Sequence, residues 1–532
     1  MRASDLLIRC LEAEGVERIF GIPGEETLEV MDSIKDSNID FILTRSEASA
    51  ALMAAACGRL SGNAQVCLST LGPGATNLIT GVAEAYLSYI PLIALTGQVS
   101  TEQAIPPRKQ YLDLVQLFRP VTKESISVRS AARLPQIMSR AFQIALSEKP
   151  GPVMVELPED QMRCQVDGKP IRRRVTRPSV CEPESLAQAR EIISQAKKPL
   201  ILAGPGTIRS LASEELRRFS RAWNIPVAHT WHGAGIMPFD DPLSLNTVGL
   251  RNMDLINPLF GEMDTVILLG YDVSEFQPNF WNFGVEKRVI FIGSQPLEAA
   301  HNLELELQLV GNVKHALMEL SKNACAKRSW TVEYRAKLDS CFSEILKDEQ
   351  GAVKPQLAVR AIRNALGRED ICASDVGAHM IWLARIYPVY RENTLLLSNG
   401  LIPMGIGVPT AMGAKLTCPE RKVVAVCGDG GFMMTMGELE TAQRLNLSFV
   451  TIIFNDSGLG LIRQKQERRF GHHYGTDFGS PDWVRLAESF GVKGYRAESA
   501  KELEEILTSC LGREELAVIE VPIDYRENKL LM

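Results

Sequence analysis

The stretch that decides the fold is residues 421–460, which read RKVVAVCGDGGFMMTMGELETAQRLNLSFVTIIFNDSGLG. It opens with a strand-like apolar run at 423–427, followed by Gly428-Asp429-Gly430-Gly431, which suits a tight turn because glycine tolerates unusual backbone angles. Apolar residues at helical spacing predict a helix over 435–445, and 449–454 reads as a second strand. A strand, a helix and a strand in this order form one right-handed βαβ unit.

Two acidic residues follow the two strands of this unit. Asp429 comes directly after the first strand, and Asp456 follows the second. Because neighbouring parallel strands end at the same edge of a sheet, both carboxylates are expected on one rim. Oxygen ligands beside the N–H groups of a helix start suit a hard cation that holds a diphosphate. A bare GDGG is more often only a turn, so the prediction depends on the second acidic residue.

The composition is that of a large globular protein without a nucleic-acid or membrane partner. The 532 residues suffice for three domains, and the net charge of −6 comes without a long basic run. No apolar run reaches membrane-spanning length, and the opening MRASDLLIRCLEAEGV is an amphipathic helix pattern rather than a signal peptide. The 11 Cys include no CxxC pair, which favours a cytoplasmic, reducing location over disulfides or zinc.

Short apolar strands alternate with helices in three successive parts of the chain. We expect an N-terminal domain over 1–172, a central domain over 184–325 and a C-terminal domain over 354–532. A basic, proline-bearing linker and a charged helical segment at 322–347 separate them. Other predicted strands are 18–21, 41–44, 66–70, 91–96, 199–203, 227–230, 265–270, 288–292, 370–374 and 394–398. The fold class is therefore α/β, with three consecutive Rossmann-like domains and mostly parallel sheets.

The pairing of Gly428-Asp429-Gly430 with Asn455-Asp456 across one crossover resembles the signature of thiamine-diphosphate enzymes. The resemblance implies that Asp429, Asp456 and the backbone carbonyl of Gly458 hold Mg²⁺. It covers essentially the whole chain and implies pyrimidine-binding, central and diphosphate-binding domains, in that order. It is strongest with the acetolactate synthases, and closer to their catabolic type.

Glu47 follows the predicted strand 41–44 at the start of a helix over 49–60. A carboxylate at such a place is usually a first-turn acid that gains from the helix dipole. The resemblance places the family's catalytic glutamate here, where it bonds the pyrimidine ring of the cofactor and drives its activation. The flanking Ser46 and Ala48 depart from the synthase pattern, which leaves the acceptor substrate open.

Three further residues of the N-terminal part match the family on less specific motifs. Gly24 ends a Gly-Ile-Pro-Gly turn, Asn77 ends TLGPGATN, and Gln110 precedes Arg119-Pro120 at the synthase spacing. Taken alone, these residues are a turn glycine, a helix cap and a polar loop residue. The resemblance implies cofactor contacts for Gly24 and Asn77, and a substrate contact for Gln110.

The C-terminal part carries two more matching motifs. Residues 375–379 read DVGAH after a strand, and 398–405 read SNGLIPMG where the family has a GLGTMG turn, with Ile402 and Pro403 departing. Met404 matches the apolar residue that bends the cofactor, although a methionine can also be core filler. The resemblance implies catalytic roles for Glu47, Gln110 and Met404, and cofactor contacts for Gly24, Glu47, Asn77, Gly377, Ala378, His379, Ser398, Asn399, Met404, Gly428, Asp429, Gly430, Gly431 and Asp456.

Two segments bear on flavin and on substrate choice. Residues 270–282, GYDVSEFQPNFWN, resemble the flavin-free catabolic synthases, so thiamine diphosphate and Mg²⁺ are the expected cofactors and FAD is not expected to be required. Lys465 stands where biosynthetic synthases carry a tryptophan, which favours pyruvate as both donor and acceptor.

The function implied is that of a thiamine-diphosphate-dependent transferase or lyase of the acetolactate synthase type. It decarboxylates pyruvate and transfers the remaining two carbons to a second 2-keto acid, giving 2-acetolactate. A 2-keto acid decarboxylase, or a carboligase with an aldehyde acceptor, stays open as an alternative. A non-catalytic regulatory subunit is the remaining alternative, and the presence of Glu47, Asp429 and Asp456 argues against it. We expect a homodimer or homotetramer; no regulatory partner is evident from the sequence.

Overall fold

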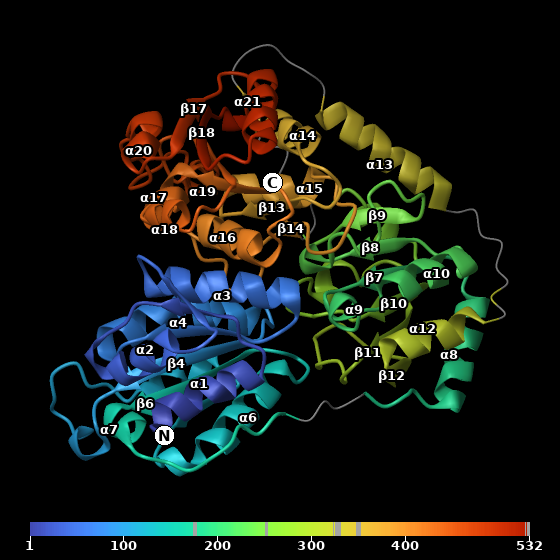
Figure 1. The fold of residues 1–532 in the computed structure, drawn as a ribbon. Helices are drawn as coiled ribbons and strands as arrows, with labels where there is room; N and C mark the ends of the chain where they lie inside the picture. The colour runs from blue at the N-terminus through green and yellow to red at the C-terminus, as the bar shows by residue number, and fades with distance from the viewer. Residues whose placement is uncertain are drawn as a thin grey trace.

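The fold consists of three α/β units in sequence order, each built around its own sheet (Figure 1). The computed structural model describes residues 1–173, 178–249, 254–322, 324, 331–346, 353–526 and 528. Each unit contains one six-stranded sheet, and every strand pair in the three sheets is parallel. The prediction of three consecutive α/β units with parallel sheets is confirmed.

The N-terminal sheet has the strand order β2-β1-β3-β4-β6-β5. Its strands are β1 Arg18–Gly21, β2 Asp40–Leu43, β3 Gln65–Ser69, β4 Leu92–Gln98, β5 Glu124–Ser127 and β6 Pro152–Pro158. Its helices are α1 Ala3–Ala13, α2 Leu28–Lys35, α3 Glu47–Ser61, α4 Gly72–Leu87, α5 Leu114–Phe118, α6 Leu134–Leu146 and α7 Glu159–Arg163. The strands β4 and β6 are buried along their whole length, as expected for a parallel sheet covered on both faces.

The central sheet has the order β12-β11-β10-β7-β8-β9. Its strands are β7 Pro199–Ala203, β8 Val227–His229, β9 Ser244–Thr247, β10 Thr265–Leu269, β11 Arg288–Gly293 and β12 Leu307–Val310. Its helices are α8 Pro183–Gln195, α9 Gly206–Arg209, α10 Ser213–Trp223, α11 Asn257–Phe260 and α12 Val313–Ser321, followed by α13 Thr331–Ile345. This is the doubly wound order of dinucleotide-binding sheets.

The C-terminal sheet, β14-β13-β15-β16-β18-β17, repeats the strand order of the N-terminal sheet. Its strands are β13 Ile371–Ser374, β14 Leu395–Leu396, β15 Val423–Gly428, β16 Val450–Asn455, β17 Lys493–Arg496 and β18 Ala517–Pro522. Its helices are α14 Pro355–Ala365, α15 Ala378–Ile386, α16 Gly407–Thr417, α17 Asp429–Thr435, α18 Glu438–Arg444, α19 Gly460–Phe470, α20 Trp483–Ser489 and α21 Ala500–Gly512.

The shared strand order fixes where a ligand can bind. In an open parallel sheet, ligands bind beyond the carboxyl ends of the strands where the strand order reverses direction. In the N-terminal sheet that point lies between β1 and β3, and in the C-terminal sheet it lies between β13 and β15. At these points Gly24 follows β1, Asn77 follows β3, His379 follows β13 and Asp429 follows β15. Glu47, Gln110 and Asp456 follow the neighbouring strands β2, β4 and β16.

The N-terminal and C-terminal units pack together through α3 and α16, which lie side by side in Figure 1. Small residues permit a close approach: a Cβ built on Gly413 would lie 2.6 Å from the Met53 carbonyl oxygen and 2.8 Å from Ala56. The thiol of Cys57 also donates to the Gly413 carbonyl at 3.3 Å. One hydrophobic core therefore continues from the first unit into the third.

The predicted strands agree with the observed ones to within two residues at either end, but the helix predicted over 435–445 is wrong at its start. The helix α17 begins at Asp429, directly after β15, and α18 follows a break at Met436 and Gly437. A Cβ on Gly431 would lie 2.5 Å from Asp375 Oδ1. Glycine is therefore required at 431 because the Asp375 carboxylate approaches the first turn of α17 closely, and not because the chain makes a turn there.

Two predicted segments extend beyond the described residues. Residue 174 of the basic linker lies outside them, as do residues 323, 325–330 and 347 of the charged helical segment. Within the described part of the chain, no helix is long and apolar enough to cross a membrane.

Candidate active site

A cavity of about 120 Å³ lies at the carboxyl edge of the C-terminal sheet. Its lining comes from the segments that follow β13, β15 and β16, together with Met404 and Tyr525. The predicted site residues in its wall are Gly377, Ala378, His379, Met404, Gly428, Asp429, Gly430, Gly431, Asp456 and Gly458. The βαβ unit of the sequence thus brings both acidic residues to one rim, as predicted.

The two carboxylates of this cavity lie close to each other; Asp429 is buried and Asp456 is half-buried. Burial raises the pKa of Asp429 above its usual value. Burial, and secondly the charge of Asp429, raise the pKa of Asp456 to about 7. Arg463 Nη1, 3.7 Å from Asp456 Oδ2, offsets part of this repulsion. A bound cation would remove the remaining electrostatic penalty.

Two buried polar atoms of the cavity residues have no hydrogen-bond partner, namely Asp429 Oδ2 and His379 Nε2. Buried polar atoms are almost always paired, so an unpaired acceptor and an unpaired ring nitrogen in one cavity indicate a missing ligand. A carboxylate oxygen suits a cation, and an imidazole N–H suits a phosphate oxygen. The residues present therefore fit a diphosphate with its cation.

A cation here must take some of its ligands from outside the side chains. Among the residues that the structure describes, no three His, Cys, Asp or Glu side chains cluster in a way that could hold a metal. Mg²⁺ usually binds through one or two carboxylates plus phosphate oxygens and waters. The pair Asp429 and Asp456 with the Gly458 carbonyl matches that pattern.

Asp375 is a site residue that sequence reasoning overlooked. It is fully buried, and its carboxylate accepts hydrogen bonds from the backbone N–H groups of Val376, Gly405 and Gly407. Burial raises its pKa to about 6. It thereby joins the cavity segments before His379 and after Met404. The signal available in the sequence was an acidic residue directly after a predicted strand and two residues before a glycine.

The second group of predicted residues lies at the carboxyl edge of the N-terminal sheet. Glu47 is the first residue of α3 and is 8% exposed. Asn77, on α4, donates from Nδ2 to Glu47 Oε2 at 3.0 Å. A Cβ on Gly74 would lie 3.1 Å from Glu47 Oε1, so the other oxygen faces the first turn of α4. Asn77 therefore orients a buried carboxylate rather than capping a helix.

Gln110 and Gly24 border the same edge. A Cβ on Gly72 would meet the backbone carbonyl of Gln110, and one on Gly24 would meet the side chain of Thr70. Gln110 itself has a left-handed backbone, φ 63°. The loop that carries Gln110 is thus held against the start of α4, one turn before Asn77.

The remaining predicted residues lie elsewhere. Ser398 donates to Glu84 Oε2 at 2.8 Å, and Asn399 Nδ2 is buried without a partner. Neither lines the C-terminal cavity, and among the described residues that do line it none belongs to the N-terminal unit. The predicted residues thus form two half-sites, one on each outer unit of the chain.

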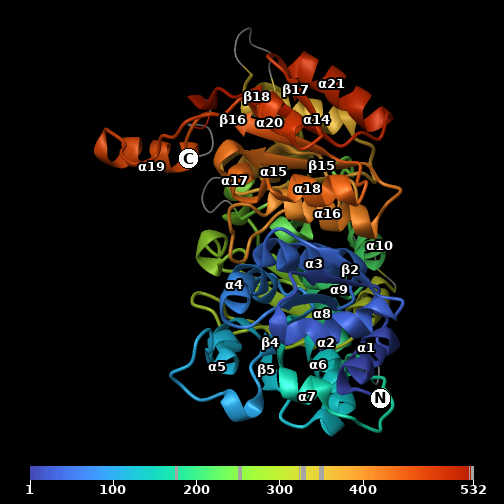
Figure 2. The ribbon, with the colours of Figure 1, turned by 60° about the vertical axis from the view of Figure 1, so that its left-hand side comes forward.

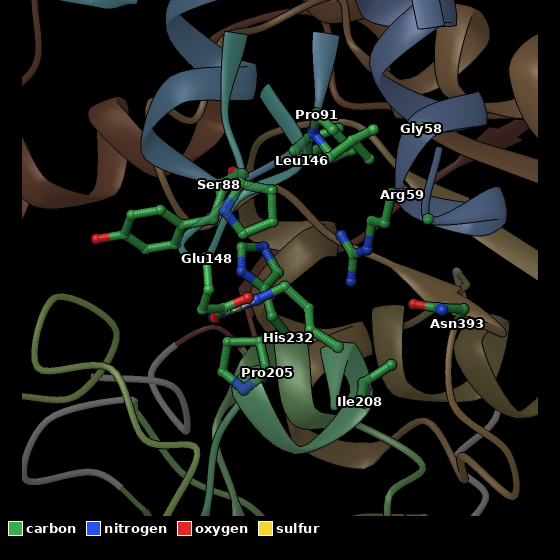
Figure 3. A pocket seen from close by; sticks show the side chains of 15 residues that line it. Gly58, Arg59, Ser88, Pro91, Leu146, Glu148, Pro205, Ile208, His232 and Asn393 are labelled. Carbon is green, nitrogen blue, oxygen red and sulfur yellow. Dashed lines mark hydrogen bonds and ion pairs between the residues drawn. The ribbon is translucent and has the colours of Figure 1, made fainter. Parts of the chain in front are cut away.

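A larger cavity, about 180 Å³, lies among all three units at the opposite edge of the N-terminal sheet (Figure 3). Its wall includes Arg59, Glu148, His232 and Asn393, and none of the predicted site residues. Beside it, Lys149 Nζ lies 2.8 Å from Asp272 Oδ2 and 4.6 Å from the centre of the Tyr89 ring.

Comparison with known proteins gives the same order of units. The N-terminal TPP binding domain of thiamine pyrophosphate enzymes matches residues 1–116, the central domain matches 186–320, and the C-terminal TPP binding domain matches 375–521. Each match lies within one of the three units; the first ends before β5 and β6, and the third begins just after β13.

Three relatives that match this chain over almost their whole length are all named acetolactate synthases. The "Probable acetolactate synthase large subunit" of Methanocaldococcus jannaschii is 36% identical, over 99% of this chain and 93% of that protein. The "Acetolactate synthase, catabolic" of Raoultella terrigena is 35% identical, over 99% and 96%. The "Acetolactate synthase" of Bacillus subtilis is 32% identical, over 99% and 94%. The chain therefore belongs to the thiamine pyrophosphate enzyme family, in the group that contains the acetolactate synthases.

Proposed function

We propose that this protein is an acetolactate synthase that condenses two molecules of pyruvate. One pyruvate loses its carboxylate as CO₂, and a new carbon–carbon bond joins its two remaining carbons to the keto carbon of the second pyruvate, giving 2-acetolactate. The observation that carries the proposal is the C-terminal cavity, where Asp429 and His379 each present an unpaired buried polar atom beside a second carboxylate, Asp456.

Thiamine diphosphate would supply the electron sink that a 2-keto acid needs to lose CO₂. His379 and the N–H groups at the start of α17 would bind its diphosphate directly. Asp429, Asp456 and the Gly458 carbonyl would bind a Mg²⁺ that also holds the diphosphate. Gly377, Ala378 and Gly428 complete this wall, where backbone can approach the ligand.

The N-terminal half-site supplies the proton chemistry in this proposal. Glu47 would hold a proton on a cofactor ring nitrogen, and the bond from Asn77 to Oε2 leaves Oε1 for this role. Gln110 would face the reacting substrate from the adjoining loop. Met404 offers a flexible apolar side chain that shapes the bound cofactor.

FAD is not required in this proposal. The N-terminal unit places the Lys149 ammonium on Asp272, which is 2% exposed and follows β10 at the carboxyl edge of the central sheet. A dinucleotide binds at that edge in doubly wound sheets. Lys149 and Asp272 thus already form an ion pair at the edge where a dinucleotide would bind.

We further propose that the active unit contains at least two copies of the chain. Glu47 and the C-terminal cavity lie on different units, and a complete site needs both. The helix α19, whose first residues line the cavity, extends away from the body of the protein (Figure 2). It has no buried residues, and Ile462, Phe470 and the nearby Tyr474 are 46%, 60% and 87% exposed. A second copy would cover such an arm.

The test is a pyruvate-only assay with the purified protein, thiamine diphosphate and Mg²⁺. We expect one CO₂ released for each 2-acetolactate formed, with acetolactate quantified by its conversion to acetoin in acid. CO₂ release with acetaldehyde as the main product would instead identify a decarboxylase and would overturn the proposal.

A further inference from the structure

Glu84, near the end of α4, is a buried carboxylate that binds a loop of another domain. It is 3% exposed. Its Oε2 accepts hydrogen bonds from Ser398 Oγ at 2.8 Å and from the backbone N–H groups of Leu401 and Ile402 at 3.1 and 3.3 Å. Its Oε1 accepts from Ser88, the residue that caps the end of its own helix. The N-terminal unit thus holds the loop of residues 398–402 through one side chain.

The same loop is anchored at its beginning by two other units of the chain. Arg59 Nη1 donates to the Leu397 carbonyl at 2.8 Å, and His232 Nε2 lies 3.1 Å from that oxygen. Figure 3 shows both side chains extending toward the cavity among the three units. The start of the loop is therefore fixed independently of Glu84.

The loop is strained where Glu84 binds it. Ile402 has φ 61°, a left-handed conformation that is a true outlier for a β-branched residue. Met404 follows two residues later in the wall of the C-terminal cavity, and Asp375 fixes Gly405 just beyond it. The residue that faces the cavity thus lies between two carboxylate anchors, one of which comes from the N-terminal unit.

Glu438 is the counterpart on the C-terminal unit. It is 1% exposed, and its Oε1 accepts from the backbone N–H groups of Arg45 and Ser46 at 3.0 and 3.1 Å. Its Oε2 accepts from Thr441 on its own helix. Arg45 and Ser46 directly precede Glu47, so a C-terminal side chain holds the backbone that leads to Glu47.

We propose that Glu84 and Glu438 are reciprocal positioning residues, each holding the cofactor-contacting loop of the other domain. Glu84 fixes the path of the loop that presents Met404, and Glu438 fixes the start of α3 that presents Glu47. This inference rests on the proposed function, because only there do Met404 and Glu47 meet the cofactor. Neither carboxylate reaches the C-terminal cavity, so both act through other residues.

The hydrogen-bond geometry shows what a conservative change would preserve. In each residue one oxygen faces the foreign loop and the other faces a hydroxyl of its own helix, Ser88 or Thr441. A hydroxyl can also accept, so glutamine can direct its carbonyl to the foreign N–H groups and its NH₂ to the hydroxyl. Leucine keeps similar volume but accepts nothing. The pair of variants therefore separates hydrogen bonding from packing.

The first measurement is amide hydrogen exchange on the cofactor-free protein. Glu84→Leu should speed exchange at Leu401 and Ile402 by roughly tenfold to a hundredfold, since bonds to a charged acceptor are among the stronger ones. Glu438→Leu should do the same at Arg45 and Ser46. The matched control is Glu156→Leu: Glu156 is also a buried N-terminal carboxylate, but its partners Gln98 and Ser127 belong to the same sheet.

The second measurement is the dissociation constant of thiamine diphosphate, by calorimetry with excess Mg²⁺. We expect Glu84→Leu and Glu438→Leu to weaken binding about tenfold or more, Glu84→Gln and Glu438→Gln to restore most of it, and Glu156→Leu to leave it unchanged. The proposal fails if exchange at the foreign loop is unaltered, or if binding survives the leucine changes. If the wild type binds the cofactor but forms no 2-acetolactate from pyruvate, the proposed function fails and the positioning role stands.

Discussion

Asn77 donates a hydrogen bond from Nδ2 to Oε2 of Glu47 at 3.0 Å, and this bond joins the second turn of α4 to the first turn of the neighbouring helix α3. Because the amide occupies one carboxylate oxygen, only Oε1 remains free for a ligand. A first-turn acid that merely complemented the helix dipole would need no such partner. The bond therefore supports a chemical role for Glu47.

Replacing Glu47 by glutamine should keep the fold and the binding of thiamine diphosphate and Mg²⁺, because glutamine keeps the shape of the side chain and does not displace the backbone at the start of α3. Acetolactate formation should fall by roughly 10²–10⁴-fold, the usual contribution of a positioned acid or base. Exchange of the cofactor C2 proton with deuterium, followed by acid-quench NMR, should slow by a similar factor.

The control for this variant is Glu124→Gln, since Glu124 is a carboxylate of the same unit that pairs with exposed Arg140. This variant should exchange the cofactor C2 proton and form acetolactate at the wild-type rates. Wild-type proton exchange in Glu47→Gln would show that Glu47 is only a helix-start acid.

The cation-free protein should lose stability as the pH rises. Burial and Asp429 raise the pKa of Asp456 to about 7, above the value of about 3.9 for an unfolded aspartate. A raised carboxyl pKa stabilises the fold fully below the unfolded value, and this contribution is lost as the pH rises to the folded value. The thermal midpoint should therefore decline between about pH 4 and pH 7 and level off above it.

Asp456→Asn isolates this effect, because other groups titrate equally in both proteins. Without cation the difference in midpoint between variant and wild type should shift in favour of the variant as the pH rises. With Mg²⁺ and thiamine diphosphate the wild type should regain the advantage above pH 7, where its carboxylates are ionised. Parallel curves with and without Mg²⁺ would argue against a cation at this pair.

The sequence predicted most of the third sheet and the C-terminal half-site because both follow local rules. Asp429 and Asp456 each end a buried strand, and parallel neighbours must end together, so their meeting required no knowledge of distant contacts. The start of α17 was missed because the glycines suggested a turn outside any helix. Gly431 instead lies within the helix, where the carboxylate of Asp375 leaves no room for a side chain. Glu84 and Glu438 were missed because their partners also lie far away in the sequence. An acidic residue on a helix is expected to face solvent, and both are buried only because another domain packs over them.

Flavin should be dispensable. Protein reconstituted with thiamine diphosphate and Mg²⁺ alone should reach full activity, show no flavin absorbance and gain nothing from added FAD. Lys149→Met, which leaves the buried Asp272 carboxylate without its cationic partner, should destabilise the protein by about 3 kcal/mol, and Lys149→Met with Asp272→Asn should recover part of that loss. A bound flavin needed for turnover would contradict this prediction.

Ile402→Gly should make cofactor binding less dependent on Glu84. The left-handed backbone at 402 costs isoleucine about 1–2 kcal/mol more than glycine, and the family turn that the sequence resembles has glycine there. In a double-mutant cycle, the loss of cofactor affinity caused by Glu84→Leu should be smaller in the Ile402→Gly background than in the wild type. Additive effects would mean that Glu84 does not hold the strained residue.

The division of the site between two domains gives the most direct test of assembly. Glu47→Gln damages the N-terminal half-site and Asp429→Ala the C-terminal one, so each variant alone should be nearly inactive. If each complete site combines halves from two chains, a mixed dimer has one site with both changes and one site with neither. Random pairing makes half of the dimers mixed, so a co-expressed equal mixture should recover up to about a quarter of wild-type activity.

Mixed dimers can be isolated by placing different affinity tags on the two variants and purifying through both. The control pairs Glu47→Gln with Asn77→Ala, two changes in the same half-site, and should recover nothing because every site then carries one defect. Each doubly tagged sample should elute as a dimer or larger by light scattering. Activity in the first mixture but not in the second would place Glu47 of one chain beside Asp429 of the other. Inactivity of both mixtures, with mixed dimers present, would mean that one chain builds its whole site by itself.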